Sequence, residues 1–234
     1  MKNYLLVLCC WLAMTVSAQT TIEPNLKWGK PTQQELTMTE YAADKDADAV
    51  ELFRDVNVYY AFINGDFRVI NNVKCRLKVL KPEGKSVADG EILIWRNSSN
   101  DTHEVVRALK ATAYNLENGK VVKTKLESSS VHEEELDTND KLLKFSVPQV
   151  RVATVIEYEY RLESDYYYQL RDWYAQSEIP VLYTRYSVSI PEWLSFHIEE
   201  SGMNTLEKKT DSNSLTVGEE HVNTEEHIFI GRNL

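Results

Sequence analysis

The sequence predicts an all-β fold, an antiparallel β-sandwich-like domain with a short N-terminal arm or helix. From Val50 onward, apolar and polar residues alternate, which is the period of a strand with one buried and one solvated face. Two Asn-Gly pairs, Asn64-Gly65 and Asn118-Gly119, each separate two runs of strand-forming residues. Asn-Gly favours the type I′ turn that joins antiparallel strands, and many strands with short links are typical of a sandwich or barrel.

Residues 1–18 have the features of a secretory signal peptide. Lys2 precedes an apolar run over residues 4–14, and Val16-Ser17-Ala18 supplies the small residues of a cleavage site, which leaves Gln19 as the new N-terminus. The run is shorter than the roughly 20 residues of a membrane-spanning helix. We therefore expect an exported protein, in the periplasm or on the outer surface, with no transmembrane segment after signal cleavage.

A lipid anchor is the alternative interpretation of this leader, because Cys9 and Cys10 lie within the apolar run. Leu8 is bulkier than the residue that usually precedes a lipid-modified cysteine, and the cysteine pair lies in the middle of the run rather than at its end. Both features favour ordinary signal cleavage. After cleavage Cys75 is the single cysteine, so no disulfide can form within the chain.

Residues 19–48 are polar and mixed, which indicates an N-terminal arm with a short helix or an ordered loop. Pro31 is followed by Thr32, which is a good N-cap residue, and by Glu35 at the third helical position. This spacing is that of a capping box, in which each side chain accepts a hydrogen bond from the other residue's backbone. We expect a helix to begin after Thr32.

Residues 49–234 are expected to form the β-sandwich domain. The alternation is clearest in the segments 73–79, 143–147, 152–162, 186–190 and 194–198. It places Cys75 on a buried face, where a cysteine acts as an inert apolar side chain. The polar residues of these segments are expected to face solvent: Lys74, Arg76, Lys78, Arg151, Glu157, Glu159 and Arg161.

The charge pattern argues against several functional classes. The formal net charge is −10, which becomes −11 when Lys2 is removed, and the basic residues are scattered. Binding to nucleic acid or to an anionic membrane needs clustered cations, so we expect neither. Asp44, Asp46 and Asp48 have the spacing of a calcium loop, but Ala49 stands where such a loop needs glycine. We expect no metal site, no cofactor and no catalytic residue.

The most unusual stretch is aromatic and contains five Tyr or Trp residues between positions 166 and 174. If the stretch is a strand, its side chains alternate between two faces, and some aromatic rings must face outward. The candidate docking surface consists of Tyr166, Tyr167, Tyr168, Arg171, Asp172, Trp173 and Tyr174. The alternative is that these rings pack in the core and expose only their hydroxyl groups.

Several segments, in this order, resemble one bacterial family. They are Trp28-Gly29-Lys30-Pro31, Glu35-Leu36-Thr37-Met38 with Tyr41, residues 114–122, Val155-Ile156-Glu157-Tyr158, Leu170-Arg171-Asp172-Trp173-Tyr174 and Ile179-Pro180-Val181. The family is domain of unknown function 3857, which precedes a transglutaminase-like domain in exported proteins of Gram-negative bacteria. The resemblance implies a β-sandwich-like accessory domain whose catalytic partner is a separate domain.

The expected function is therefore a non-catalytic, exported β domain, accessory to a transglutaminase- or protease-like domain that this chain lacks. The expected partner is that transglutaminase-like domain, in cis in a longer protein. The alternative is a stand-alone module that binds a carbohydrate or a peptide through the aromatic stretch. Under either interpretation the chain is not an enzyme, and a glycan or peptide ligand remains compatible with the sequence.

Overall fold

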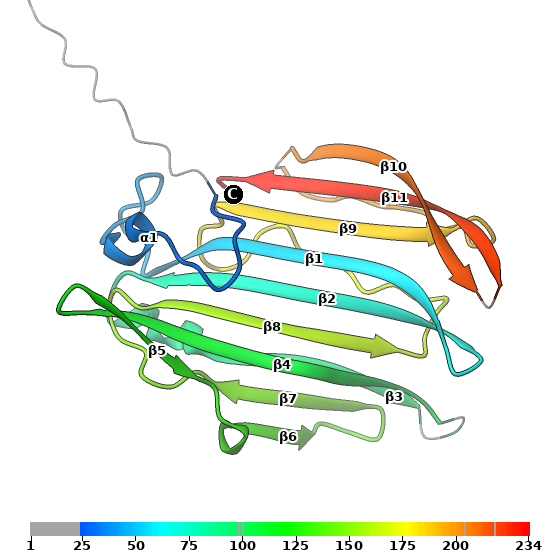
Figure 1. Ribbon diagram of the computed structural model, residues 1–234, viewed down its shortest axis with the longest axis horizontal. Coiled ribbons are helices and arrows are strands. Elements are labelled where there is room, and N and C mark those ends of the chain that lie inside the picture. Colours follow the sequence, from blue (N-terminus) through cyan, green and yellow to red (C-terminus); the bar gives the residue numbers. More distant parts are fainter. Residues whose placement is uncertain (1–23, 98, 100, 204, 218) are drawn as a thin grey trace, which may run out of the picture.

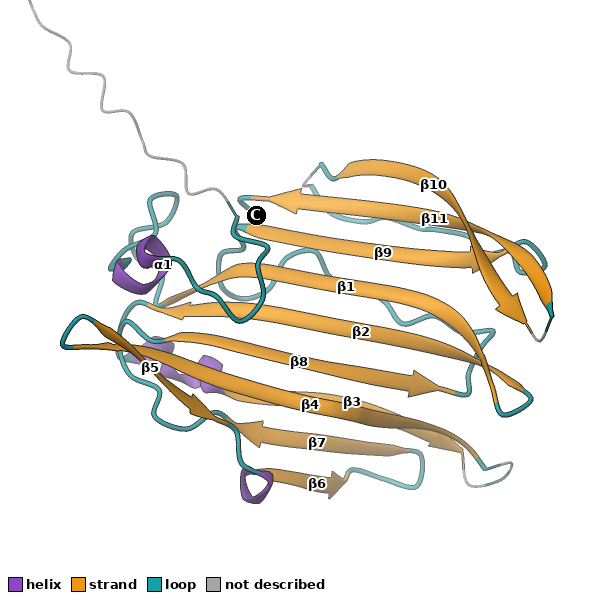
Figure 2. Cartoon of the chain, in the orientation of Figure 1, coloured by secondary structure: helices purple, strands orange, loops and turns teal. Residues whose placement is uncertain are grey.

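The computed structural model describes residues 24–97, 99, 101–203, 205–217 and 219–234. The expected signal peptide, residues 1–18, and its cleavage site lie outside the described residues. Most of the chain is strand, and the helices are short (Figures 1 and 2). The prediction of an all-β fold is confirmed.

The elements follow in this order: α1 (Gln33–Thr37), β1 (Ala49–Ile63), β2 (Asp66–Val79), the 3-10 helix η1 (Glu83–Ala88), β3 (Asp89–Asn97), β4 (Thr102–Glu117), β5 (Lys120–Lys125), the 3-10 helix η2 (Ser128–Ser130), β6 (Val131–Glu135), β7 (Asp140–Ser146), β8 (Val155–Ser164), β9 (Tyr183–Pro191), β10 (Glu207–Val217) and β11 (Glu220–Arg232). The strands form one 11-stranded sheet in the order β10-β11-β9-β1-β2-β8-β4-β3-β7-β6, and β5 pairs with β4 outside this path.

One strand pair departs from the antiparallel pattern. β1 and β9 are parallel, with Arg54 opposite Thr184 and Tyr59 opposite Ser189. They are separated by more than a hundred residues, so no hairpin turn fixes their relative direction. The sheet is therefore mixed, which the alternation of residues along single strands could not reveal.

The sheet folds over at the contact between β3 and β4. These strands pair only at Arg96–His103 and Asn97–Thr102, and β3 then continues with β7 and β6. Side chains of β3 and β7, such as Ile92 and Phe145, share one buried cluster with side chains of β2, β4 and β8. This packing of one part of the sheet on another gives the domain its sandwich-like core.

Both predicted hairpin turns are present. Asn64 and Gly65 join β1 to β2, and Asn118 and Gly119 join β4 to β5. All four residues have positive φ angles, between 49° and 92°, as a type I′ turn requires. Glycine is needed at the second position because its missing Cβ removes the steric cost of this conformation.

The predicted start of the helix is also confirmed. The Thr32 side chain accepts a hydrogen bond from the Glu35 backbone, and the Glu35 carboxylate accepts one from the Thr32 backbone. Leu36 of helix α1 then shares a buried apolar cluster with Tyr114 of β4 and Val155 of β8. Most of the N-terminal arm, residues 24–48, crosses the sheet as an irregular segment.

Two strand predictions need correction. The segment 194–198 is not a strand, because it lies across the sheet face, where Leu194 and Phe196 pack against a cluster around Val188. Alternation there reflects burial on one side of an irregular segment. The strand predicted over residues 152–162 begins only at Val155, and Val152 is exposed.

Three polar residues that were expected to face solvent are buried. Arg76 and Lys78 have no exposed surface, and Glu157 is 2% exposed. The prediction was wrong because the N-terminal arm covers their face of the sheet. The alternation on the opposite face is confirmed, since Cys75 is fully buried there.

Candidate functional site

The aromatic stretch lies in a long loop, residues 165–182, between β8 and β9. The expectation that it forms a strand is wrong, because the chain leaves the sheet after Ser164 and no part of residues 166–174 is in a strand. The side chains therefore do not alternate strictly between two faces. Their positions depend on separate contacts with the rest of the domain.

Arg171 anchors the loop to the start of β4 and to β3. Its guanidinium forms an ion pair with the Glu104 carboxylate and donates a hydrogen bond of 2.9 Å to the Leu93 carbonyl. The guanidinium also lies over the Trp95 ring, 4.0 Å from its centroid. Planar guanidinium groups suit both types of contact, which a lysine could not reproduce.

Glu104 is the buried partner of this anchor, with 4% of its surface exposed. Besides Arg171, its carboxylate accepts a 2.8 Å hydrogen bond from the Trp95 backbone. It thus supplies a hydrogen-bond acceptor to β3 at the place where β3 diverges from β4. Sequence reasoning missed Glu104 and Trp95, because Arg171 is 67 residues from Glu104 and no periodicity relates them.

Two more aromatic residues of the loop are held by the domain. The Tyr166 ring lies 6.2 Å from the Trp95 ring, and its hydroxyl donates a 3.1 Å hydrogen bond to the Thr102 carbonyl. Trp173 stacks on Tyr186 of β9 with 5.2 Å between ring centroids. These contacts fix both ends of the stretch and limit how far Tyr166 and Trp173 can reach toward a partner.

The other members of the candidate docking surface are exposed. The exposed fractions are 41% for Tyr167, 60% for Tyr168 and 71% for Tyr174, and Asp172 is exposed as well. The rings of Tyr167 and Tyr168 contact each other edge to face, 5.4 Å apart. The structure thus divides the predicted surface into an anchored part and an exposed part.

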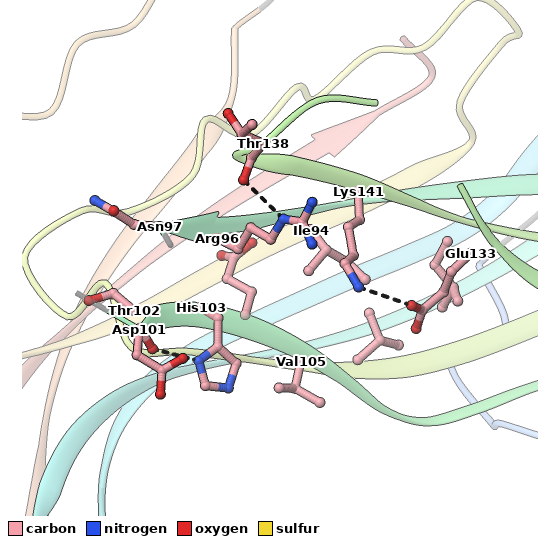
Figure 3. A pocket seen from close by; sticks show the side chains of 13 residues that line it. Ile94, Arg96, Asn97, Asp101, Thr102, His103, Val105, Glu133, Thr138 and Lys141 are labelled. Atoms are coloured by element: carbon pink, nitrogen blue, oxygen red, sulfur yellow. Dashed lines mark hydrogen bonds and ion pairs between the residues drawn. The ribbon is translucent and has the colours of Figure 1, made fainter. Parts of the chain in front are cut away.

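An open pocket of about 690 Å³ adjoins the anchor at β3 and β4 (Figure 3). Both apolar and charged side chains line it. The lining includes Ile94, Arg96, His103, Val105, Glu133 and Lys141, which Figure 3 labels. A smaller pocket of about 240 Å³ lies between Trp95, Tyr166 and Gln169. Pockets of this size range can hold small ligands or single side chains.

Cys75 is poorly suited to nucleophilic chemistry. It is fully buried, and burial raises the pKa of its thiol well above the ordinary value, with a further contribution from the nearby Glu51 carboxylate. Only the thiolate is a good nucleophile, and a raised pKa removes it at neutral pH. Among the described residues, His, Cys, Asp and Glu side chains form no group that could hold a metal ion.

Arg76, on the face of β2 opposite to Cys75, is the centre of a buried polar cluster. It donates hydrogen bonds to Glu157 and Glu35, at 2.5–2.9 Å, and to the carbonyls of Asn25 and Lys27, both at 2.6 Å. Glu157 also accepts hydrogen bonds from the Tyr114 hydroxyl and, at 3.0 Å, from the Gly29 backbone. Every partner except Tyr114 and Glu157 belongs to the N-terminal arm, so this cluster fixes the arm on the sheet.

No helix of the described chain has the length and the apolar character that crossing a membrane requires.

A family model described as a domain of unknown function with a solved structure, DUF3857, matches residues 66–224. No curated protein matches the sequence.

Solved structures resemble the chain only distantly. A protein of Parabacteroides distasonis described as a candidate protease has 13% identity and a TM-score of 0.48, over 80% of this chain and 36% of its own. A variant of an M1 zinc metallopeptidase from Deinococcus radiodurans has 8% identity and a TM-score of 0.33, over 80% and 43%. The native yeast LTA4 hydrolase has 11% identity and a TM-score of 0.32, over 86% and 33%. The chain thus spans less than half the length of each of these structures.

Proposed function

This chain belongs to the DUF3857 family, and we propose that it is a non-catalytic, exported accessory domain that docks onto a transglutaminase- or protease-like domain. The observation that carries the proposal is the exposed part of the loop between β8 and β9. Tyr167, Tyr168 and Tyr174 are exposed in the loop that the ion pair of Arg171 and Glu104 anchors. Family resemblance supplies the expected partner, a transglutaminase-like domain in the same protein.

The composition of this surface supports a role in protein–protein contact. Tyrosine combines a large apolar ring with a polar hydroxyl and loses little side-chain entropy on binding, so it is enriched among residues that dominate binding energy. The anchoring contacts of Arg171, Tyr166 and Trp173 hold the loop in place before a partner arrives. A loop that is ordered in advance loses less entropy on association.

The environment of Cys75 argues against a catalytic thiol in this domain. A buried thiol with a raised pKa is neither accessible nor ionised at neutral pH. In this proposal the bond-breaking chemistry belongs to the partner domain, and this domain holds that partner or its substrate in position. Export to the periplasm or the outer surface is part of the same proposal and rests on the features of residues 1–18.

Binding to the partner domain tests the docking proposal. A transglutaminase-like domain that follows a domain of this family is supplied in trans, and the dissociation constant is measured by calorimetry. Tyr168→Ala combined with Tyr174→Ala should weaken binding by about 2 kcal/mol or more, the usual threshold for dominant interface residues. Leu26→Ala is the matched control, because Leu26 is 54% exposed in the N-terminal arm. Equal affinity of the double variant and the control would refute docking through this loop.

A stand-alone binding module is the second candidate. The smaller pocket favours it, because Trp95 and Tyr166 line that pocket and aromatic side chains can stack on a sugar ring or an apolar residue. A glycan or peptide that binds the isolated chain and loses affinity in Tyr166→Ala, while the partner domain does not compete with it, would support this candidate over docking.

A further inference from the structure

One strand position of the sheet is unfilled alongside the first half of β4. β8 pairs with one edge of β4 from Glu104 to Tyr114. On the other edge, β5 pairs with residues 112–117, whereas β3 pairs only with Thr102 and His103. Among the described residues, no strand pairs with the stretch 104–110 on that edge. An added segment there would occupy the position that β5 occupies farther along β4.

This edge faces a second wall, so it borders a groove. The pocket of about 690 Å³ lies here, and its lining includes Val105 and Val106 of β4, Ile94 of β3 and Leu143 of β7. Figure 3 labels Ile94 and Val105. A segment bound in the groove could pair its backbone with β4 and place every second side chain against Ile94 and Leu143. Alternation of this kind is a general property of an extended chain.

β10 provides a comparison within the same sheet. It is also an edge strand, and almost all of its residues are exposed. Its Lys208 and Lys209 side chains are 56% and 59% exposed, and neither lines the pocket beside β4. β10 therefore supplies a pair of exposed cations on an edge strand away from that pocket.

The charges of the open stretch define the partner. Glu104 is buried and paired with Arg171, so the exposed charged residues of the stretch 104–110 are Arg107 and Lys110. Their side chains are 58% and 72% exposed, and their ion pairs with Glu163 and Glu159 are long, at 3.8 and 3.7 Å. Long, exposed ion pairs contribute little, so both cations can pair with a ligand instead.

We propose that this groove, lined by Glu104–Val106 of β4 and by Ile94 and Leu143, binds an extended peptide segment by strand addition to β4. The segment alternates apolar residues, which face Ile94 and Leu143, with acidic residues, which face Arg107 and Lys110. A bulge at Ala108, where φ is 54°, interrupts the regular register, so pairing is confined to residues 104–107 and the end of the segment meets Lys110. Main-chain pairing supplies affinity in this mode of recognition, and alternate side chains supply specificity.

Fluorescence anisotropy with a labelled peptide of alternating valine and glutamate, about seven residues long to span the edge, tests the proposal. The peptide should bind the whole chain, whereas a peptide of alternating valine and lysine should bind at least tenfold more weakly. Arg107→Glu with Lys110→Glu should reduce affinity for the acidic peptide at least tenfold at low salt, and by less at high salt. Lys208→Glu with Lys209→Glu on β10 is the matched control and should leave affinity unchanged.

Hydrogen exchange locates the bound peptide: those amides of residues 104–107 that point away from β8 should become protected, because the alternate ones already pair with β8. Equal binding of the acidic and basic peptides, unchanged affinity in the Arg107/Lys110 variant, or protection of β10 instead would each overturn the proposal. A concentration-dependent dimer of the free protein that the same variant abolishes would assign the groove to a second copy of this chain and would also overturn it. Binding to the transglutaminase-like domain through Tyr168 and Tyr174 is measured separately and does not depend on this result.

Discussion

Replacing Arg76 with methionine should destabilise the domain strongly. Arg76 has no exposed surface and holds the carboxylates of Glu35 and Glu157, as well as two backbone carbonyls of the arm. Methionine can occupy much of the volume of the side chain but cannot donate a hydrogen bond. The two carboxylates then lie in a buried site without their cation, which is the costliest way to break such a cluster.

The expected loss is about 3–5 kcal/mol of unfolding free energy, the usual cost of removing one partner of a buried ion pair. That is a large fraction of the 5–15 kcal/mol that typically stabilises a domain. Part of the loss should return when Glu35→Gln and Glu157→Gln are added, because the uncompensated charges are then removed. Arg151→Met is the control, since Arg151 pairs with Glu117 on an exposed surface and such pairs contribute about 0–1 kcal/mol.

Urea denaturation measures the free energies, and hydrogen exchange of residues 25–37 shows whether the arm detaches. In Arg76→Met, the arm amides should exchange faster than in the control, because Asn25 and Lys27 lose the hydrogen bonds that hold them. If Arg76→Met lowers the unfolding free energy by less than about 1 kcal/mol, or if the triple variant recovers none of the loss, the cluster does not hold the arm on the sheet.

Three further predictions follow from the described contacts. Burial lowers the pKa of Lys78 to about 8, from about 10.5 for a free lysine. The unfolded state therefore binds more protons between these pH values, and the unfolding free energy relative to that of Lys78→Met should rise from pH 8 to 10. An unfolding free energy, measured in urea, that changes equally with pH in the two proteins would contradict this. Gly84→Ala should destabilise by about 1–3 kcal/mol, because a Cβ there would lie 2.1 Å from the Asp48 carbonyl oxygen, and an unchanged melting temperature would refute the contact. Cys75 should react with a thiol reagent only as fast as the protein unfolds, and rapid modification of the native protein would show that it is accessible.

The local features that sequence predicted correctly depend on neighbouring residues. The turns at Asn64-Gly65 and Asn118-Gly119 need only the positive φ angles that these residues adopt easily. The capping box of Thr32 and Glu35 closes over four residues. Burial of Cys75 follows from alternation along one strand. None of these features depends on how distant segments pack.

The features that sequence did not predict depend on long-range packing. Arg76 and Glu157 alternate with apolar residues, as solvent-facing residues do, but the arm covers them. Alternation separates the two faces of a strand and cannot tell whether a second layer covers the polar face. Likewise, composition identified the aromatic stretch, but only the contacts of Arg171 and Trp173 show which of its side chains are anchored and which are exposed.

The buried charges also explain why the arm takes one position. An apolar contact is not directional and tolerates sliding, whereas the guanidinium of Arg76 donates its hydrogen bonds only in fixed directions. Its hydrogen bonds reach Asn25, Lys27 and Glu35, which are spaced along the arm, so a shift of the arm by one residue would leave several buried groups without partners. Desolvation offsets much of the energy of such a cluster. Its main consequence is therefore a defined position for the arm on the sheet, because every alternative position has a higher free energy.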